Sequence, residues 1–91
     1  MPEMKRLICL DPGHGGVDPG AIGQAGTREA DMNLVVVMKL KTELAERGIS
    51  AVTTRDDDTF VSLQDRAMKA NHAGAIAFVS VHCNSANNRQ A

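Results

Sequence analysis

Apolar and polar residues form alternating blocks along the chain, and these blocks predict three strands separated by two helices. Short apolar or β-branched runs at residues 7–10, 49–54 and 76–81 are typical of strands. The third run is mostly apolar, as expected for a strand covered on both faces. Between the runs, residues 29–47 and about 62–73 have the spacing and composition of helices.

The helix ends carry recognisable signals. Thr27 is expected to be the N-cap of the first helix, and Gly48 to end it in the left-handed conformation. Ser62 and Asp65 have the spacing of a capping box at the start of the second helix, which Gly74 should close. The first helix is predicted to turn five apolar side chains toward the sheet: Met32, Val35, Val36, Leu40 and Leu44.

The βαβαβ order predicts an α/β fold with a mainly parallel sheet, right-handed crossovers and helices on both faces, which makes three layers. The chain has 91 residues, 43% of them hydrophobic, and no internal repeat or low-complexity segment divides it. Residues 1–91 are therefore expected to form one domain, or part of one. The order of the strands within the sheet does not follow from the sequence.

Composition narrows the possible functions. The net charge is −1, with Lys+Arg 10 against Asp+Glu 11, so no basic surface for nucleic acid or an anionic membrane is indicated. With two Phe, no Trp and no Tyr, no aromatic platform for stacking is evident. No apolar run has the length of a membrane span, and the start MPEMKRLICL lacks the apolar core of a signal peptide. Cys9 and Cys83 are too few for a disulfide framework, so an intracellular protein or a trimmed chain is expected.

The main chemical signal is a glycine-rich loop, DPGHGGVDPG, with His14 at its centre. Ligands of open α/β sheets bind beyond the carboxyl ends of the strands. His14 follows the first strand there, His82 directly follows the third, and Glu29 opens a crossover helix at the same edge. The loop does not fit a dinucleotide fingerprint, because Asp18 occupies the third glycine position, and the chain has no P-loop lysine motif.

Two histidines and one carboxylate form a common zinc-binding set that leaves a fourth position for water. Each residue alone has a simpler interpretation: a surface histidine for His14, a hydrogen-bonded structural histidine for His82, and a favourable helix-dipole charge for Glu29. Their shared position at one sheet edge favours the metal site. His72 is interpreted as a structural or surface residue, and residues 55–58 as a solvated polar loop rather than a cation site.

Four segments together resemble the zinc-dependent N-acetylmuramoyl-L-alanine amidases of the amidase-3 type. They are LDPGHGGVDPGAIG, TREADMNL, TTRDDDTFVSLQDRAMKAN and FVSVHCNS, and they span residues 7–85 in the family's order. The resemblance implies zinc bound by His14, Glu29 and His82, and hydrolysis of the amide between N-acetylmuramic acid and L-alanine of peptidoglycan. It also implies action at the bacterial cell wall, by a phage lysis enzyme, a mother-cell lysin or a domain excised from a secreted precursor.

The family domain continues beyond the second histidine and carries a further glutamate that serves in proton transfer. No acidic residue of this chain matches that glutamate, so no catalytic acid or base is assigned, and weak or absent hydrolysis is expected. Apolar sheet and helix surface should also remain uncovered, which would suit an oligomer or a missing second half of the domain. Two alternatives stay open: a non-catalytic zinc- or wall-binding fragment, and a metallohydrolase of another amide or ester.

Overall fold

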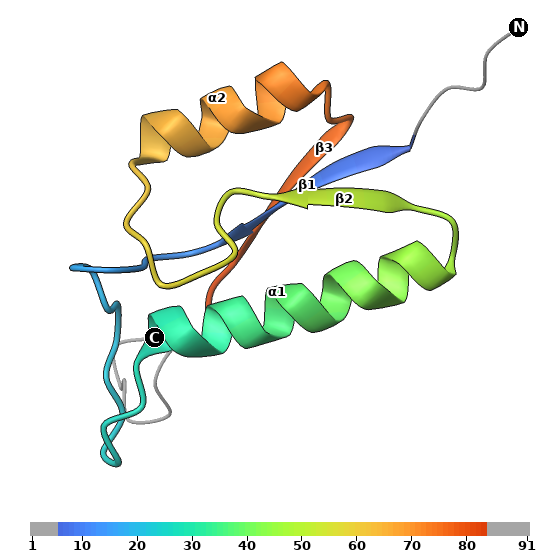
Figure 1. Cartoon of the computed structure of the whole chain (residues 1–91). Coiled ribbons are helices and arrows are strands. Elements are labelled where there is room, and N and C mark those ends of the chain that lie inside the picture. The colour runs from blue at the N-terminus through green and yellow to red at the C-terminus, as the bar shows by residue number, and fades with distance from the viewer. Residues whose placement is uncertain (1–5, 84–91) are drawn as a thin grey trace, which may run out of the picture.

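Three strands and two helices follow one another along residues 6–83, the part of the chain that the computed structural model describes. In chain order they are β1 (Leu7–Pro12), α1 (Glu29–Glu46), β2 (Ser50–Thr53), α2 (Leu63–Ala73) and β3 (Ala77–Val81). The predicted α/β order is confirmed, and Figure 1 shows the two helices on opposite sides of the sheet.

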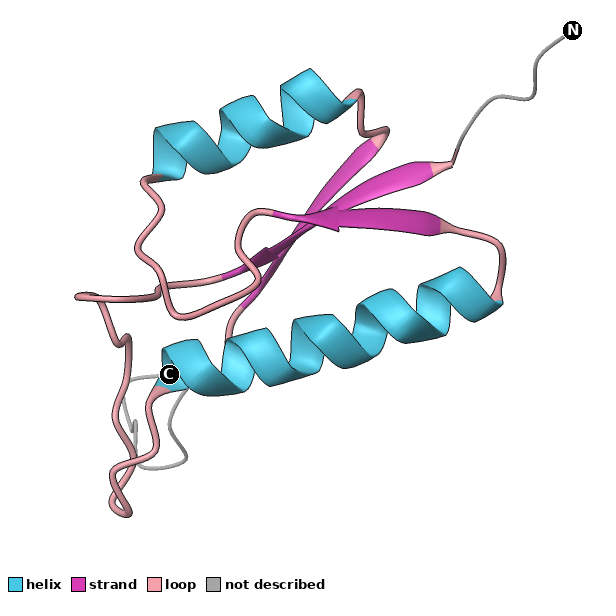
Figure 2. Ribbon diagram, viewed as in Figure 1, coloured by secondary structure: helices cyan, strands magenta, loops and turns pink. Residues whose placement is uncertain are grey.

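The sheet is parallel and its strand order is β2-β1-β3. The chain therefore moves one way from β1 to β2 and then reverses past β1 to reach β3. Because parallel crossovers are right-handed, this reversal requires the two connecting helices to cover opposite faces. Figure 2 shows the resulting layers, with the sheet between α1 and α2. The central strand β1 is the most buried, with Cys9 and Leu10 at its middle.

The helix ends confirm most of the capping signals. Gly48 and Gly74 both have left-handed backbones, with φ of 78° and 72°. The Ser62 hydroxyl accepts a hydrogen bond from the Asp65 amide at 3.0 Å. Helix α1 begins at Glu29 as predicted, but its N-cap is Arg28, so the prediction of Thr27 as the N-cap is wrong. The carbonyls of residues 21 and 19 accept the N–H groups of residues 29 and 30 at 2.8 and 3.0 Å, so the loop backbone itself caps this helix.

The apolar face predicted for α1 is only partly correct. Met32, Val35 and Val36 are exposed, whereas the buried positions are Glu29, Ala30, Asn33 and Val37. The helix carries apolar residues on more than one side. The side that is buried carries Glu29 and Asn33, whose polar contacts are described below.

The prediction that the third strand is covered on both faces is also wrong. β3 pairs only with β1 among the described strands, and its residues 77–80 are exposed. The expected uncovered apolar surface is present, with Phe78 and Val79 on β3 being 45% and 41% exposed. Within residues 6–83, neither helix combines the length and apolar composition needed to cross a membrane.

Candidate metal centre

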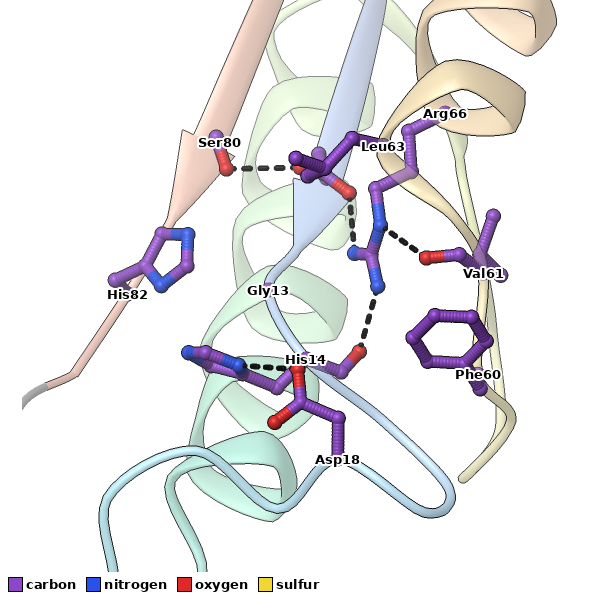
Figure 3. A pocket seen from close by; sticks show the side chains of 10 residues that line it. Gly13, His14, Asp18, Phe60, Val61, Leu63, Arg66, Ser80 and His82 are labelled. Atoms are coloured by element: carbon purple, nitrogen blue, oxygen red, sulfur yellow. Dashed lines mark hydrogen bonds and ion pairs between the residues drawn. The ribbon is translucent and has the colours of Figure 1, made fainter.

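Strand topology brings the three predicted ligands to one edge of the sheet. β1 and β3 are parallel neighbours, and the Gly13 amide extends their pairing with a 3.0 Å hydrogen bond to the Val81 carbonyl. His14 and His82 therefore leave the sheet side by side, as Figure 3 shows. In a sheet of order 2-1-3, the gap between β1 and β3 is the topological switch point, where ligands bind. One ligand atom from each of His14, Glu29 and His82 lies within 4.8 Å of the others.

The Glu29 carboxylate lies between the two imidazoles. Its Oε1 is 3.3 Å from His14 Nε2, and its Oε2 is 3.2 Å from His82 Nδ1. The two rings are perpendicular, with centroids 5.0 Å apart. The Glu29 side chain is only 3% exposed, and the basic side chains that contact it within residues 6–83 are the two imidazoles.

Glu29 remains ionised in this buried position. Burial raises the pKa of its carboxyl, but hydrogen bonds from the Ala21 amide and the Asn33 side chain, together with His14 and His82, outweigh burial and hold the pKa below its usual range. The Ala21 bond is 3.0 Å long. The site therefore presents a buried negative charge at neutral pH.

Asp18 orients His14. Its Oδ2 lies 2.8 Å from His14 Nδ1, and the pKa of Asp18 is lowered chiefly by this hydrogen bond. With Asp18 ionised, Nδ1 is the donor and the Nε2 lone pair faces Glu29. A carboxylate behind a metal-binding imidazole is the usual outer partner that fixes its tautomer.

This donor set fits zinc. Two imidazole nitrogens and one carboxylate oxygen converge, and the carboxylate is buried without a lysine or arginine within ion-pair distance in the described part of the chain. Neutral imidazoles with a single carboxylate are typical of three-ligand zinc sites that keep one position open. A divalent cation would neutralise the charge that Glu29 brings into the interior.

Two glycines of the loop make room for the side chains of the predicted ligands. A Cβ at Gly13 would lie 2.6 Å from Nε2 of the His82 ring. A Cβ at Gly20 would lie 2.6 Å from the His14 ring and 2.7 Å from Glu29 Oε1. Glycine at these two positions therefore lets the side chains of the three predicted ligands approach the loop backbone.

Replacing Gly13 with Ala is expected to displace the His82 ring and weaken zinc binding while the fold persists. Gly13 has no positive φ, so the effect would be steric rather than a backbone penalty. Isothermal titration of zinc checks the affinity, and circular dichroism checks the fold. Gly48→Ala is the control, because it strains a left-handed backbone in open space far from the site. Equal zinc affinity in Gly13→Ala and wild type would contradict the steric role.

Asn33 joins all three ligand segments, and sequence reasoning missed it. Its side chain is fully buried and donates to the Gly13 carbonyl at 3.0 Å and weakly to Glu29 Oε2 at 3.4 Å. Its Oδ1 accepts the Cys83 amide at 2.7 Å. Asn33 lies four residues, or one helical turn, after Glu29, so the two side chains are on the same side of the helix. This spacing was the signal in the sequence that could have identified Asn33 as a partner of Glu29.

The polar-loop interpretation of residues 55–58 is wrong for Arg55. Arg55 and Arg66 are 3% and 4% exposed, and both donate hydrogen bonds to backbone carbonyls of the His14 loop. We call these two residues the arginine clamp. Arg66 also pairs with the buried Asp11 carboxylate at 2.7 Å. The signal for this network was an aspartate at the end of an apolar strand, which requires a partner when buried.

A cleft of about 290 Å³ opens beside the two histidines. Phe60, Val61 and Leu63 also line it, and Figure 3 shows Phe60 and Val61 across the cleft from His82. Phe60 and Leu63 are 52% and 84% exposed, so the cleft offers apolar surface to a ligand. Phe60 is the aromatic residue among those that line the cleft.

Comparison with known proteins identifies the family. A profile of the Amidase_3 family, described as N-acetylmuramoyl-L-alanine amidase, matches residues 8–91. The chain belongs to this family. It is 51% identical over 83 residues to the endolysin of Bacillus phage SPP1, covering 90% of this chain and 30% of the endolysin. It is 44% identical over 87 residues to the N-acetylmuramoyl-L-alanine amidase AmiA of Salmonella typhimurium, covering 96% of this chain and 30% of AmiA.

Solved amidases have the same fold. The amidase AmiC2 of Nostoc punctiforme superposes with a TM-score of 0.87 and 45% identity, over 97% of this chain and 49% of AmiC2. The catalytic domain of CwlV superposes with a TM-score of 0.83 and 37% identity, over 93% of this chain and 48% of that domain. The chain thus spans about half of these solved amidases and under a third of AmiA and the endolysin. The resemblance to the amidase family and the α/β fold are confirmed.

Proposed function

We propose that this chain is the zinc-binding part of an enzyme that hydrolyses the amide between N-acetylmuramic acid and L-alanine in peptidoglycan, with His14, Glu29 and His82 as zinc ligands. The observation that supports this most directly is the convergence of these three side chains within 4.8 Å beside a cleft, in a chain of the amidase family. Work at the bacterial cell wall follows from the proposed substrate.

The chain's own residues have distinct roles in this proposal. Glu29 and the two imidazoles hold the ion, and Asp18 keeps the Nε2 lone pair of His14 available by accepting from Nδ1. Bound zinc supplies Lewis-acid chemistry, which polarises an amide carbonyl. The apolar side of the cleft, with Phe60 and Leu63, contacts the methyl groups and sugar face of the substrate and excludes water from them.

The described residues offer no free proton-transfer group at the cleft. Asp11 and Asp18 are the carboxylates that line it. Asp11 is engaged by Arg66, Thr54 and Ser80, and Asp18 by His14. Positioned proton transfer contributes about 10²–10⁴-fold to such reactions. We place the missing acid or base in the part of the family domain that this chain does not span, so the chain should bind zinc and substrate but hydrolyse slowly.

One alternative is a zinc-dependent wall-binding module without catalysis, which differs from the main proposal only in the chemical step. The exposed apolar side chains of β3 could be buried by another part of a longer protein or by a second copy of this chain.

Incubation of the zinc-loaded chain with purified peptidoglycan tests the proposed function. We expect sedimentation of the chain with the wall material in the presence of zinc, loss of that binding with a chelator, and slow release of new L-alanine amino groups. Phe60→Ala should weaken wall binding and leave zinc stoichiometry unchanged, since Phe60 lines the cleft but contributes no ligand. Binding without any amine release selects the wall-binding module. Wall binding that is unchanged by the chelator contradicts both functions. Turnover equal to that of a full-length family amidase contradicts the statement that these residues lack a proton-transfer group.

A further inference from the structure

The arginine clamp, Arg55 and Arg66, holds the backbone of the His14 loop from two sides. Arg55 donates from Nε to the Pro12 and His14 carbonyls at 3.1 and 2.8 Å, and from Nη2 to the Gly13 carbonyl at 2.9 Å. Arg66 donates from Nη1 to the Pro12 carbonyl at 2.8 Å and from Nη2 to the His14 carbonyl at 2.9 Å. Three successive carbonyls are therefore fixed by two planar, charged donors.

The clamp acts where the backbone is strained. His14 has φ of 64°, and among the described residues it is the only one other than glycine with a positive φ. Such a conformation is strained for a residue with a Cβ and persists only where surrounding contacts enforce it. The His14 carbonyl accepts from both arginines, so the peptide that follows His14 is held in place and the imidazole is directed toward Glu29.

The clamp also reaches the other two ligand segments. Arg55 Nη2 donates to the carbonyl of Ala30, the residue after Glu29, at 2.9 Å. Arg66 Nη1 is 2.7 Å from Asp11 Oδ1, and Asp11 Oδ2 accepts from the Ser80 hydroxyl at 2.8 Å, two residues before His82. The loop, the start of α1 and the end of β3 are thus tied to the same pair of guanidinium groups.

Packing alone explains the clamp poorly. Arg55 donates only to carbonyls, and no carboxylate of the described residues is within ion-pair distance of it. Burial lowers the pKa of Arg55, and the charge of Arg66 lowers it further. Apolar side chains of similar volume often fill such positions at equal or better stability. Two buried positive charges beside the His14 loop are better explained if the geometry of that loop depends on their hydrogen bonds.

We propose that Arg55 and Arg66 are positioning residues of the zinc site, which set the left-handed conformation of His14 and its distance from Glu29 before the metal binds. The inference rests on the proposed zinc site. The clamp contributes no ligand and acts through backbone carbonyls. Zinc would then enter a preorganised site and would not need to order the loop.

Zinc affinity of Arg55→Lys and Arg66→Lys tests this proposal. Lysine keeps the charge but lacks the planar fork that holds several carbonyls at once. Loss of an outer partner typically weakens metal binding about 10–100-fold, and we expect an increase of that size in the zinc Kd of each variant. Cobalt substituted for zinc should show a changed ligand-field spectrum, which reports geometry independently of activity.

Two controls separate positioning from stability. Arg47→Lys changes an exposed arginine at the far end of α1, and Gly74→Ala strains a distant left-handed residue; both should keep the wild-type zinc Kd. An unchanged Kd and cobalt spectrum in folded Arg55→Lys and Arg66→Lys overturns the proposal. Absence of zinc binding by the wild type would instead overturn the proposed function.

A measurement on the wild type covers the case in which neither lysine variant folds. The three-bond HN–Hα coupling and the Hα–HN cross-peak intensities of His14, measured by NMR, report whether φ is positive. Preorganisation predicts the left-handed value before zinc is added and no change on titration. An averaged or negative φ in the metal-free chain, converted by zinc, overturns the proposal.

Discussion

Glu29→Gln is expected to abolish zinc binding at the site while leaving the metal-free fold intact. Glutamine has nearly the same shape, and its Oε1 still accepts the Ala21 amide that now bonds to Glu29 at 3.0 Å. What it removes is the only carboxylate of the three-residue set. Loss of a direct anionic ligand should exceed the roughly 10–100-fold effect of losing an outer partner.

Thermal and denaturant unfolding with and without zinc measure this effect. At a free zinc concentration 100-fold above Kd, the wild type should gain about 2.7 kcal/mol of unfolding free energy, and Glu29→Gln should gain nothing. Without zinc the variant should be modestly less stable than the wild type, because the hydrogen bonds and imidazoles that lower the pKa of Glu29 favour its ionised form in the folded state. Asp31→Asn, an exposed acid in the same helical turn, is the matched control and should keep the full gain. A zinc gain that survives in Glu29→Gln contradicts the three-ligand site.

Asp11→Asn is expected to destabilise the fold by about 3–5 kcal/mol, the usual effect of removing one member of a buried ion pair. Asp11 is 4% exposed and accepts hydrogen bonds from Arg66, Thr54 and Ser80 at 2.7 to 2.8 Å. Its loss leaves the Arg66 charge buried without a carboxylate. Urea unfolding at neutral pH measures the effect, and Asp56→Asn, in the exposed loop, serves as the control.

The same substitution should change the acid sensitivity of the fold. Burial raises the pKa of Asp11, but the hydrogen bonds from Thr54, Arg66 and Ser80 and the Arg66 charge lower it below its ordinary value of 3.8. A carboxyl with a lowered folded-state pKa contributes stability that is fully present above the unfolded-state pKa and is lost as the pH falls through the folded-state pKa. The difference in unfolding free energy between wild type and Asp11→Asn should therefore be constant above about pH 5 and become smaller toward lower pH. A difference that stays constant into strong acid would show that the Asp11 charge is unimportant.

Sequence reasoning was strongest where a pattern is local or topological. The lengths of the apolar runs and the glycines at the helix ends predicted the strands and helices to within a few residues of their observed ends. The placement of His14, Glu29 and His82 at one edge of the sheet followed from parallel topology, because the carboxyl ends of parallel strands lie at the same edge. The adjacency of β1 and β3, which that argument needed, came only from the structure.

What the sequence did not predict depends on contacts between distant residues. The burial of Arg55 arises from carbonyls 41 to 43 positions away, which no local pattern encodes. The rotation of α1 could not be chosen by periodicity, because apolar residues such as Val36 and Val37 lie on different sides of the helix and only one side meets the sheet. The left-handed backbone of His14 is likewise imposed by the clamp and not by its own preference.

The pairing of β1 with β3 has a consequence for the order of events in folding. These strands lie about 70 positions apart in the chain, as the Asp11–Ser80 register shows, and closing so long a segment is entropically slow. Since His82 reaches Glu29 only after β3 has docked, the metal should bind late, after the three described strands have assembled. In a refolding experiment, the time at which zinc binds should then report when β3 pairs with β1. Zinc should have little effect on the rates of the earlier folding steps.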